Sequence, residues 1–302
     1  MNKKVLAICY SQTGQLAEII GKLTAPMLEA GIIVETLQVQ AQPGYPFPWE
    51  AKTFMAQMPD CVMGIGKDLQ PFRLKEEKYD LVILGYQAWF LSPSIPTNSI
   101  LNHPDIQAVI KDTPVITVTG ARNMWINAME RIKKRLQELN GRLVGHIALV
   151  DKHSNYTSLV TICHWMFNGR KDRYLNIFPK PGVADEDIAH ASVFGSAIIP
   201  YLQKNEWGGL QDTLLNEGAV EVKYNLMFIE SKGKKIFAIW AKLIANRENK
   251  VPWLVAFKYY LLIALFIAAP IILTVNNIFF RPFLSARIRK QMKYYAGINF
   301  NS

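Results

Sequence analysis

The sequence predicts a doubly wound α/β domain on a five-stranded parallel sheet, followed by a basic and strongly apolar extension. Three observations support this fold class. Short apolar runs alternate with segments of helical periodicity over the first two hundred residues, the apolar runs end in polar loops, and the composition changes near residue 223. Half of the 302 residues are hydrophobic and 19% are charged, which allows a large core and argues against disorder.

The five predicted strands are short apolar runs. The run at 81–85 is apolar throughout, as a strand covered on both faces requires. The predicted strands cover residues 5–10, 33–39, 81–85, 115–118 and 143–150. Together with the helices between them they predict a first domain over residues 1–205.

Helical spacing of apolar residues predicts helices over 16–30 and 126–139, and a third over 185–202 that opens on three acidic residues. In the second helix we expect Arg131, Lys133, Lys134 and Arg135 to point outward. The proline-rich stretch 42–71 interrupts the rhythm between the second and third strands, and we interpret it as an insertion near the site. Residues 206–231 are predicted to connect this domain to the extension.

The excess of positive charge belongs to the end of the chain. Residues 223–302 hold 13 of the 34 lysines and arginines but only 2 of the 24 acidic residues, so the rest is nearly neutral. The same region holds the longest apolar run, Tyr259 to Val275, which carries no charge. Basic residues beside an apolar segment favour an anionic membrane surface, and we expect no nucleic-acid partner.

Residues 232–302 are therefore predicted to associate with the inner face of the cytoplasmic membrane. They comprise a basic amphipathic helix at 236–244, the apolar segment, and a basic tail without acidic residues. A span needs about 20 apolar residues and one charged flank outside, whereas this segment is shorter and basic on both sides. We expect it to dip into the membrane or lie in its interface. The alternatives are packing on the first domain or a homodimer seam. The basic residues of the tail are Arg281, Arg287, Arg289, Lys290 and Lys293.

Cysteine usage and the first residues indicate a cytoplasmic protein. Cys9, Cys61 and Cys163 are widely spaced, which predicts neither a disulfide framework nor a metal site. Residues 1–4 and the strand-length apolar run after them do not resemble a signal peptide, so we expect a reducing compartment.

The loop after the first strand is the strongest local signal. It reads Ser11, Gln12, Thr13, Gly14 and Gln15, directly before a helix. Two hydroxyls and free N–H groups at a helix N-terminus form a phosphate cradle. The dinucleotide and P-loop patterns are absent, and a cradle without Lys or Arg suits the monophosphate of FMN. The alternative is a polar turn with a capping threonine.

Two further loops follow the third and fourth strands and should open on the same edge of the sheet. Both carry aromatic residues that would wall a flat ligand, although these residues would equally serve as hydrophobic cover. The cofactor-binding candidates in these loops are Gln87, Ala88, Trp89, Phe90, Leu91, Thr119, Gly120, Asn123 and Trp125.

These three loops resemble the phosphate loop and the two isoalloxazine loops of flavodoxins and flavodoxin-like quinone reductases. The flavodoxin loop usually ends in a second threonine, whereas this chain has Leu16 there, which removes one phosphate contact. More narrowly, most of residues 3–190 resembles the DarA family of dialkylresorcinol biosynthesis, sometimes labelled a condensing enzyme. The segments that carry this resemblance are 10–15, 45–49, 89–96, 120–125 and 178–182.

The resemblance implies an FMN-dependent aromatase. In that family a partner ketosynthase, working with an acyl carrier protein, supplies a dialkylcyclohexane-1,3-dione that this component converts to the dialkylresorcinol of membrane lipids or aryl-polyene pigments. Condensation would need an acyl-carrying nucleophile, and neither Cys9 nor Cys163 has a recognisable His or Asn partner in the sequence.

Aromatisation removes two hydrogens, one as a proton and one as a hydride to the flavin. Arg122 is the candidate to hold the enolate oxygen, and His153, with Tyr86 as an alternative, is the candidate to take the proton. Arg122 as a surface residue, and His153 as a loop residue bonded to Asp151 or Asn155, are the structural alternatives. Two other functions fit the same pattern: a membrane-associated NAD(P)H-quinone reductase, and a non-catalytic electron carrier or scaffold.

Overall fold

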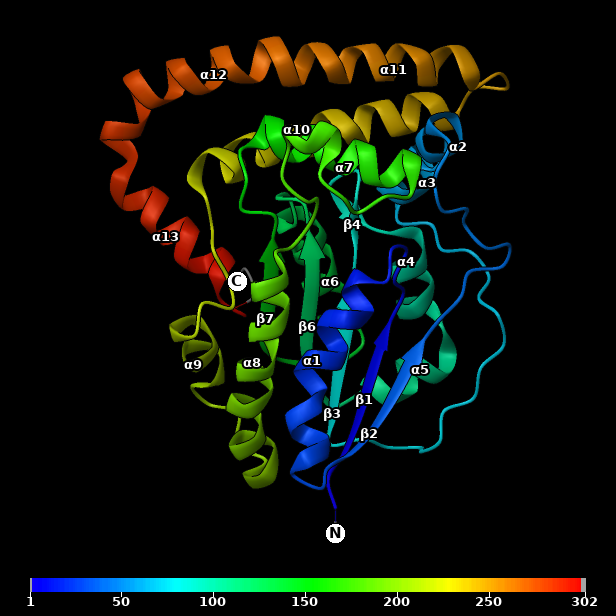
Figure 1. Ribbon diagram of the computed structural model, residues 1–302, viewed down its shortest axis with the longest axis vertical. Helices are drawn as coiled ribbons and strands as arrows, with labels where there is room; N and C mark the ends of the chain where they lie inside the picture. The colour runs from blue at the N-terminus through cyan, green and yellow to red at the C-terminus, as the bar shows by residue number, and fades with distance from the viewer. Residues whose placement is uncertain (1, 300–302) are drawn as a thin grey trace.

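A computed structural model of the protein describes residues 2–299. Its main sheet is parallel, in the order β2-β1-β3-β6-β7 (Figure 1). This is the strand order of the flavodoxin-like doubly wound fold, so the predicted fold class is confirmed. The strands are β1 (Lys4–Cys9), β2 (Ile33–Gln38), β3 (Leu81–Tyr86), β6 (Pro114–Ala121) and β7 (Arg142–Val150).

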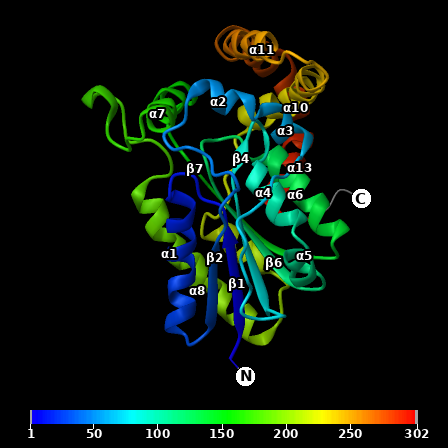
Figure 2. The ribbon, with the colours of Figure 1, turned by 90° about the vertical axis from the view of Figure 1, so that its right-hand side faces the viewer.

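Helices cover both faces of this sheet, which explains why β3 is buried along its whole length. Figure 2 shows α1 and α8 on one side of the sheet and α4, α5 and α6 on the other. The three helices predicted from spacing are present within two residues of their expected limits. The covering helices are α1 (Gln15–Glu29), α4 (Ile95–Asn102), α5 (Pro104–Ile110), α6 (Ile126–Glu138) and α8 (Asp185–Lys204).

The segment after α8 belongs to the same core. Helix α9 (Leu210–Asn216) buries Leu210 and Leu214 against the face that α8 also covers. Beyond it, Val220 pairs with Ala148 of β7 in an isolated parallel bridge. The predicted connecting segment thus adds to the sheet and its cover before the extension starts.

The insertion between β2 and β3 supports the extension. It contains α2 (Ala51–Ala56) and α3 (Met58–Met63), and α10 (Tyr224–Ala245) packs on α3 and α6. The amphipathic helix expected at 236–244 is the second half of α10, which begins twelve residues earlier. A small buried cluster joins the insertion to the extension: Met58, Val62, Ala241, Ile244 and Phe257.

The apolar segment forms one long helix above the carboxyl ends of the strands (Figure 1). It consists of α11 (Val251–Ile263), the π-helical turn η2 (Ala264–Ala268) and α12 (Ala269–Val275), and we call residues 251–275 the long apolar helix. Its inward face packs toward α10, whereas Ile263, Ile267 and Ile271 are each more than half exposed. The continuous helical region Val251–Ala296 is long and apolar enough to cross a membrane, with a mean hydropathy of 2.3 in its most apolar window.

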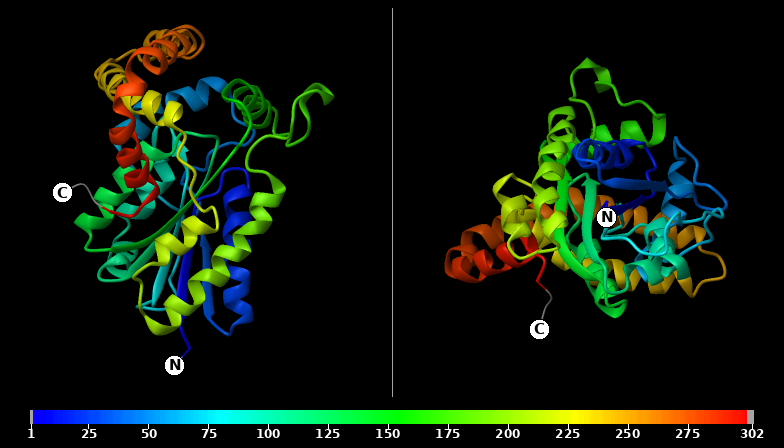
Figure 3. Two further views of the ribbon diagram at one scale, coloured as in Figure 1. Left: turned by 90° about the vertical axis from the view of Figure 1, so that its left-hand side faces the viewer. Right: turned by 90° about the horizontal axis from the view of Figure 1, so that it is seen from below.

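The tail then returns to the domain. After η3 (Asn276–Phe280) and η4 (Arg281–Leu284), α13 (Ser285–Ala296) descends beside the domain (Figure 3). Asn276 is buried and donates a hydrogen bond to the Tyr224 hydroxyl over 2.7 Å. Gln211 donates to the Ala296 carbonyl over 2.9 Å. The C-terminal end of the long apolar helix and the tail after it are therefore attached to the domain.

One sequence prediction about α6 is wrong because of this return. Lys133, expected to point outward, is 2% exposed. Its ammonium group lies 3.4 Å from Glu130, 4.5 Å from the centre of the Tyr294 ring, and donates to the Asn299 carbonyl. The returning tail covers this side chain and supplies the carbonyl oxygen that accepts its hydrogen bond.

Candidate functional site

The loop between β1 and α1 has the backbone of an anion cradle. Gly14 has a φ of +83° and is the N-cap of α1, and a Cβ there would have no atom within 4 Å. The space in front of the helix N-terminus, where amide groups lack intrahelical partners, is therefore open. The Ser11 hydroxyl accepts a hydrogen bond from the Ala17 amide over 3.3 Å, which orients it toward the first turn.

The two glutamines of this loop are used by the protein itself. The Gln12 side chain hydrogen bonds with the Tyr10 hydroxyl and donates to the Pro46 carbonyl over 2.8 Å. The Gln15 side chain accepts from the Val183 amide and donates to the Val183 carbonyl. Only their backbone groups remain for a phosphate, while the side chains anchor the insertion and the 182–183 turn around the loop.

Two buried amide oxygens on the neighbouring loops have no hydrogen-bond partner. They are Gln87 Oε1, directly after β3, and Asn123 Oδ1, after β6. Strands β3 and β6 pair in parallel, so both atoms lie at the carboxyl edge of the sheet near its β1/β3 switch point, where ligands of this fold bind. Buried acceptors are normally hydrogen-bonded. The imide N–H of an FMN ring is a donor of the kind that these two oxygens lack.

The aromatic wall is smaller than the sequence predicts. Trp89 is 9% exposed and packs in a cluster with Tyr10, Tyr45 and Trp49, and Trp125 is 2% exposed against His146. Both tryptophans therefore act as hydrophobic cover, the alternative reading of the sequence. Phe90 remains half-buried and accessible, stacked on Phe54 at 4.7 Å.

Two further cofactor candidates are structural. The Thr119 hydroxyl is buried and donates to the Tyr86 carbonyl over 2.8 Å, joining the ends of β6 and β3. Gly120 faces α1, because a Cβ there would lie 2.8 Å from the Ile19 side chain. The Thr119 side chain thus serves the sheet, and only the backbone groups of these two residues remain as candidates for contact with the cofactor.

Tyr86 is the clearest correction among the catalytic candidates. Alternation along β3 turns its ring into the core on the α6 side, where it is completely buried. Burial, together with the nearby carboxyl of Glu230, raises the pKa of Tyr86 well above its usual value. A phenol that is completely buried in the core is not available as a base for a substrate at the loops.

Arg122 lies at the junction of the β6–α6 loop and α7 (Asn155–Asn168). Its Nη1 atom donates to the Asn155 carbonyl, the Asn155 side chain and the Ser158 hydroxyl at 3.0 to 3.3 Å. Burial lowers its pKa, opposed by Cys163 and Asp151, but a guanidinium stays charged at neutral pH. All three of these hydrogen bonds to the described residues come from Nη1, so that Nη2 and Nε are left to donate to a ligand.

His153 forms a pair with a buried aspartate. Its Nδ1 lies 2.7 Å from Asp151 Oδ1, and its backbone amide donates to the same oxygen. The Asp151 side chain is fully buried, whereas the His153 ring is 41% exposed. Such a pair holds Nδ1 as the donor and leaves Nε2 as a base, so the bond to Asp151 that the sequence offered as the alternative is present and is compatible with proton transfer.

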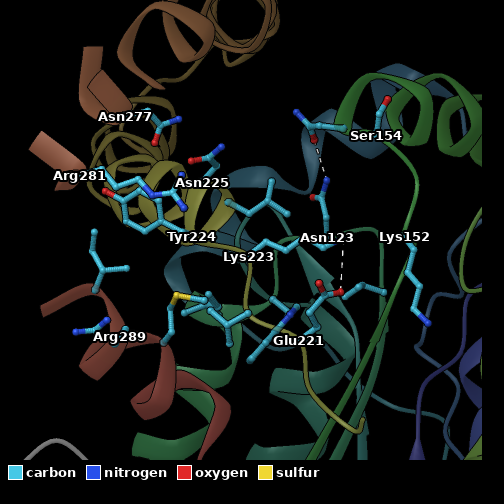
Figure 4. A pocket seen from close by; sticks show the side chains of 18 of the residues that line it. Asn123, Lys152, Ser154, Glu221, Lys223, Tyr224, Asn225, Asn277, Arg281 and Arg289 are labelled. Carbon is cyan, nitrogen blue, oxygen red and sulfur yellow. Dashed lines mark hydrogen bonds and ion pairs between the residues drawn. The ribbon is translucent and has the colours of Figure 1, made fainter. Parts of the chain in front are cut away.

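His153 lines a polar cavity of about 1020 Å³ between the end of β7, the start of α10 and the returning tail. Figure 4 looks into this cavity, where the Arg281 guanidinium lies over the Tyr224 ring at 5.1 Å. Arg122 does not line it. The two catalytic candidates thus line different cavities, and Asn123 is the one described residue that lines both this cavity and the apolar cavity beside Arg122.

Arg122 lines a second, apolar cavity of about 350 Å³. Its floor consists of the two predicted isoalloxazine loops, through Ala88, Phe90 and Met124, and its other walls come from α7, α10 and the long apolar helix. Sequence reasoning missed the wall residues outside the loops. The apolar periodicity of α10 is the sequence feature that could have indicated these residues. The sequence does not indicate which loops the apolar face of α10 covers. The wall residues include Leu159, Ile229, Gly233, Phe237, Leu261 and Leu265.

Glu230 is a second residue that sequence reasoning missed. It lies on α10, and its carboxylate accepts the Asn127 amide over 2.7 Å at the N-terminus of α6, where Trp125 provides no side-chain cap. Burial raises the pKa of Glu230 to about 7, opposed by the backbone amides of Asn127 and Ile126. One of only two acidic residues in the basic last quarter of the chain, it fastens the extension to the domain.

Comparisons with known proteins find only distant structural similarities. No protein-family model matches the chain, and no curated protein sequence matches it. Solved structures with a similar fold include a flavoprotein in complex with FMN from Lactobacillus acidophilus, 14% identical, covering 49% of this chain and 93% of that chain at a TM-score of 0.39. A flavodoxin from the domain Archaea is 9% identical and covers 67% and 99% at 0.36. These similarities are distant, and the flavodoxin-like fold rests on the strand order of this chain.

Proposed function

We propose that the protein is an FMN-dependent oxidoreductase that aromatises a dialkylcyclohexane-1,3-dione to a dialkylresorcinol at a membrane surface. One observation carries the flavin part of the proposal: an open glycine cradle at the N-terminus of α1, beside loops with two buried, unpartnered amide oxygens. Ser11, Thr13 and Gly14 would hold the phosphate, and Gln87 and Asn123 would meet the ring. The substrate class follows from the sequence resemblance, which the apolar cavity at these loops supports.

The chain's own residues supply positioning and charge. The free donors of Arg122 would hold a dione oxygen and stabilise the enolate that forms when a ring proton leaves. FMN, when bound, supplies a hydride acceptor, so that the dione loses one proton and one hydride and becomes the aromatic diol. Repeated turnover would need a two-electron acceptor such as dioxygen to take up the hydride equivalent. His153 would receive the proton only through Asn123 or water, because it lines the neighbouring cavity.

The location follows from the long apolar helix. Only 11% of its most apolar window is buried, and the tail that follows it returns to the domain. Lying in the cytoplasmic membrane interface satisfies its exposed face without carrying the tail across. Any ketosynthase or acyl carrier protein of the same pathway would meet the enzyme at this surface.

A cofactor titration tests the flavin assignment first. Full-length protein should bind FMN, and Thr13→Asp should weaken binding at least 100-fold, since placing a carboxylate beside the like-charged phosphate costs several kcal/mol. Ser196→Asp adds the same charge on exposed α8 and should bind like the wild type. Wild-type protein that ignores added FMN in a fluorescence titration would refute the proposal.

The reaction is tested separately. Incubation of the FMN-loaded protein with a synthetic dialkyl dione under air should yield a product two hydrogens lighter by mass spectrometry. Arg122→Ala should lower the rate by about 10²-fold or more if it holds the enolate. If His153→Ala turns over at the wild-type rate, His153 is not the base. Oxidation of NAD(P)H with a quinone, but not of the dione, would instead identify a quinone reductase.

A further inference from the structure

The apolar cavity is enclosed on one side by the long apolar helix. The side chains that face the cavity recur at helical spacing along it: Tyr260, Leu261, Ala264, Leu265, Ala268 and Ala269. The residues between them, such as Ile263 and Ile267, are more than half exposed on the opposite face. One helix therefore separates the cavity from the surface that we assign to the membrane.

Small residues keep this wall thin and the cavity open. Ala264, Ala268 and Ala269 face it from the long apolar helix, and Gly233 faces it from the middle of α10. A glycine inside a helix costs about 1 kcal/mol relative to alanine, so its presence needs a local reason. A Cβ at Gly233 would lie 2.8 Å from the Leu91 side chain, which shows how closely α10 approaches the β3 loop.

The charges around the cavity restrict what it can hold. Its lining contains Arg122 and Lys232 but no acidic residue, and nearly all other lining residues are apolar. A volume of about 350 Å³ is at the lower end of the range for small-ligand pockets. This combination suits an amphiphile with a polar, oxygen-bearing ring at the Arg122 end and an alkyl chain along the helices. A cationic head group is disfavoured.

We propose that this cavity is the alkyl-chain site of the substrate, and that the chain reaches it from the bilayer through the small-residue seam between α10 and the long apolar helix. The inference rests on the proposed function and adds a specificity element to it. The small residues Ala264, Ala268 and Gly233 set the length of the alkyl chain that fits in the cavity. Arg122 and Asn123 meet the ring where the cavity borders the cofactor loops.

A homologous series of 2-alkylcyclohexane-1,3-diones, from ethyl to hexyl, tests the proposal by calorimetry on FMN-loaded full-length protein in detergent. Affinity, referred to free aqueous ligand, should rise about fourfold with each methylene, as burial of about 0.8 kcal/mol per methylene predicts. Ala268→Phe should leave ethyl binding unchanged and weaken hexyl binding at least tenfold. Ile267→Phe, the adjacent position on the exposed face, should bind the whole series like the wild type.

The outcomes separate this inference from the proposed function. Unchanged hexyl affinity in Ala268→Phe, or an equal loss in Ile267→Phe, would overturn the alkyl-chain site even if the dione is oxidised. Chain-length-dependent binding without formation of a resorcinol would keep the site and refute the aromatase. If Ala268→Phe does not fold, Ala264→Leu fills the same cavity with a smaller change, and retained FMN content verifies its fold.

Discussion

Helix α8 and the long apolar helix both bury apolar side chains, but their outer faces differ: the outer face of α8 is polar and that of the long apolar helix is apolar. α8 buries Ile188, Phe194 and Ile198 on the sheet and turns polar residues to its other side. The long apolar helix packs toward α10 with one face and leaves Ile263, Ile267 and Ile271 more than half exposed on the other. A helix that is apolar all round is stable in a core or a membrane. The same local structure therefore has a polar outer face in one region of the protein and an apolar outer face in the other.

The largest expected effect contrasts a core position with a position on the outer face of the long apolar helix. Phe194→Ala should destabilise the folded protein by about 3–5 kcal/mol, because it opens a cavity under α8, where Phe194 is 1% exposed. Ile267→Ala in detergent should change stability by no more than about 0.5 kcal/mol, since Ile267 is 56% exposed. Denaturant unfolding of the two variants measures the two changes in stability. A comparable loss in Ile267→Ala would mean that the outer face is a buried protein contact.

A second prediction tests whether the exposed face of the long apolar helix binds a membrane. Replacing Ile263 and Ile267 together by serine should weaken partitioning into lipid vesicles about 100-fold, because each large apolar side chain contributes roughly 1.5–3 kcal/mol when buried. The matched control replaces Leu28 and Ile33, which are exposed at the opposite end of the domain. Sedimentation with vesicles measures the partitioning of both variants. Equal losses, or none, would contradict an interfacial role for the long apolar helix.

The pH dependence of stability tests how the two regions are joined. The pKa of Glu230 is about 7 in the folded protein, above the usual 4.5, so the folded state binds the proton more tightly. Its contribution is fully present below pH 4.5 and is lost as the pH rises through 7. Glu230→Gln, which keeps an acceptor for the Asn127 amide, should gain up to about 3 kcal/mol relative to the wild type across that window. Parallel pH profiles for the two proteins would contradict this role.

Much of the sheet was predictable because a buried parallel strand leaves a continuous apolar run. The β3 run and the polar loop after β1 are local features, and the structure preserves both. The open turn at Gly14 follows from the same local pattern. Burial of Trp89, Trp125 and Tyr86 was not predictable, since a side chain's exposure at a strand end depends on what packs above it.

The sequence by itself determined the doubly wound fold, the position of the phosphate-type loop, and the concentration of apolar and basic residues in the last quarter of the chain. These depend on periodicity and composition, which act over a few neighbouring residues. Only the tertiary structure decided that the tail returns to cover Lys133, that Glu230 caps α6, and that Arg122 and His153 face different cavities. Each depends on contacts between segments far apart in the chain, and no local pattern encodes which distant face will meet which.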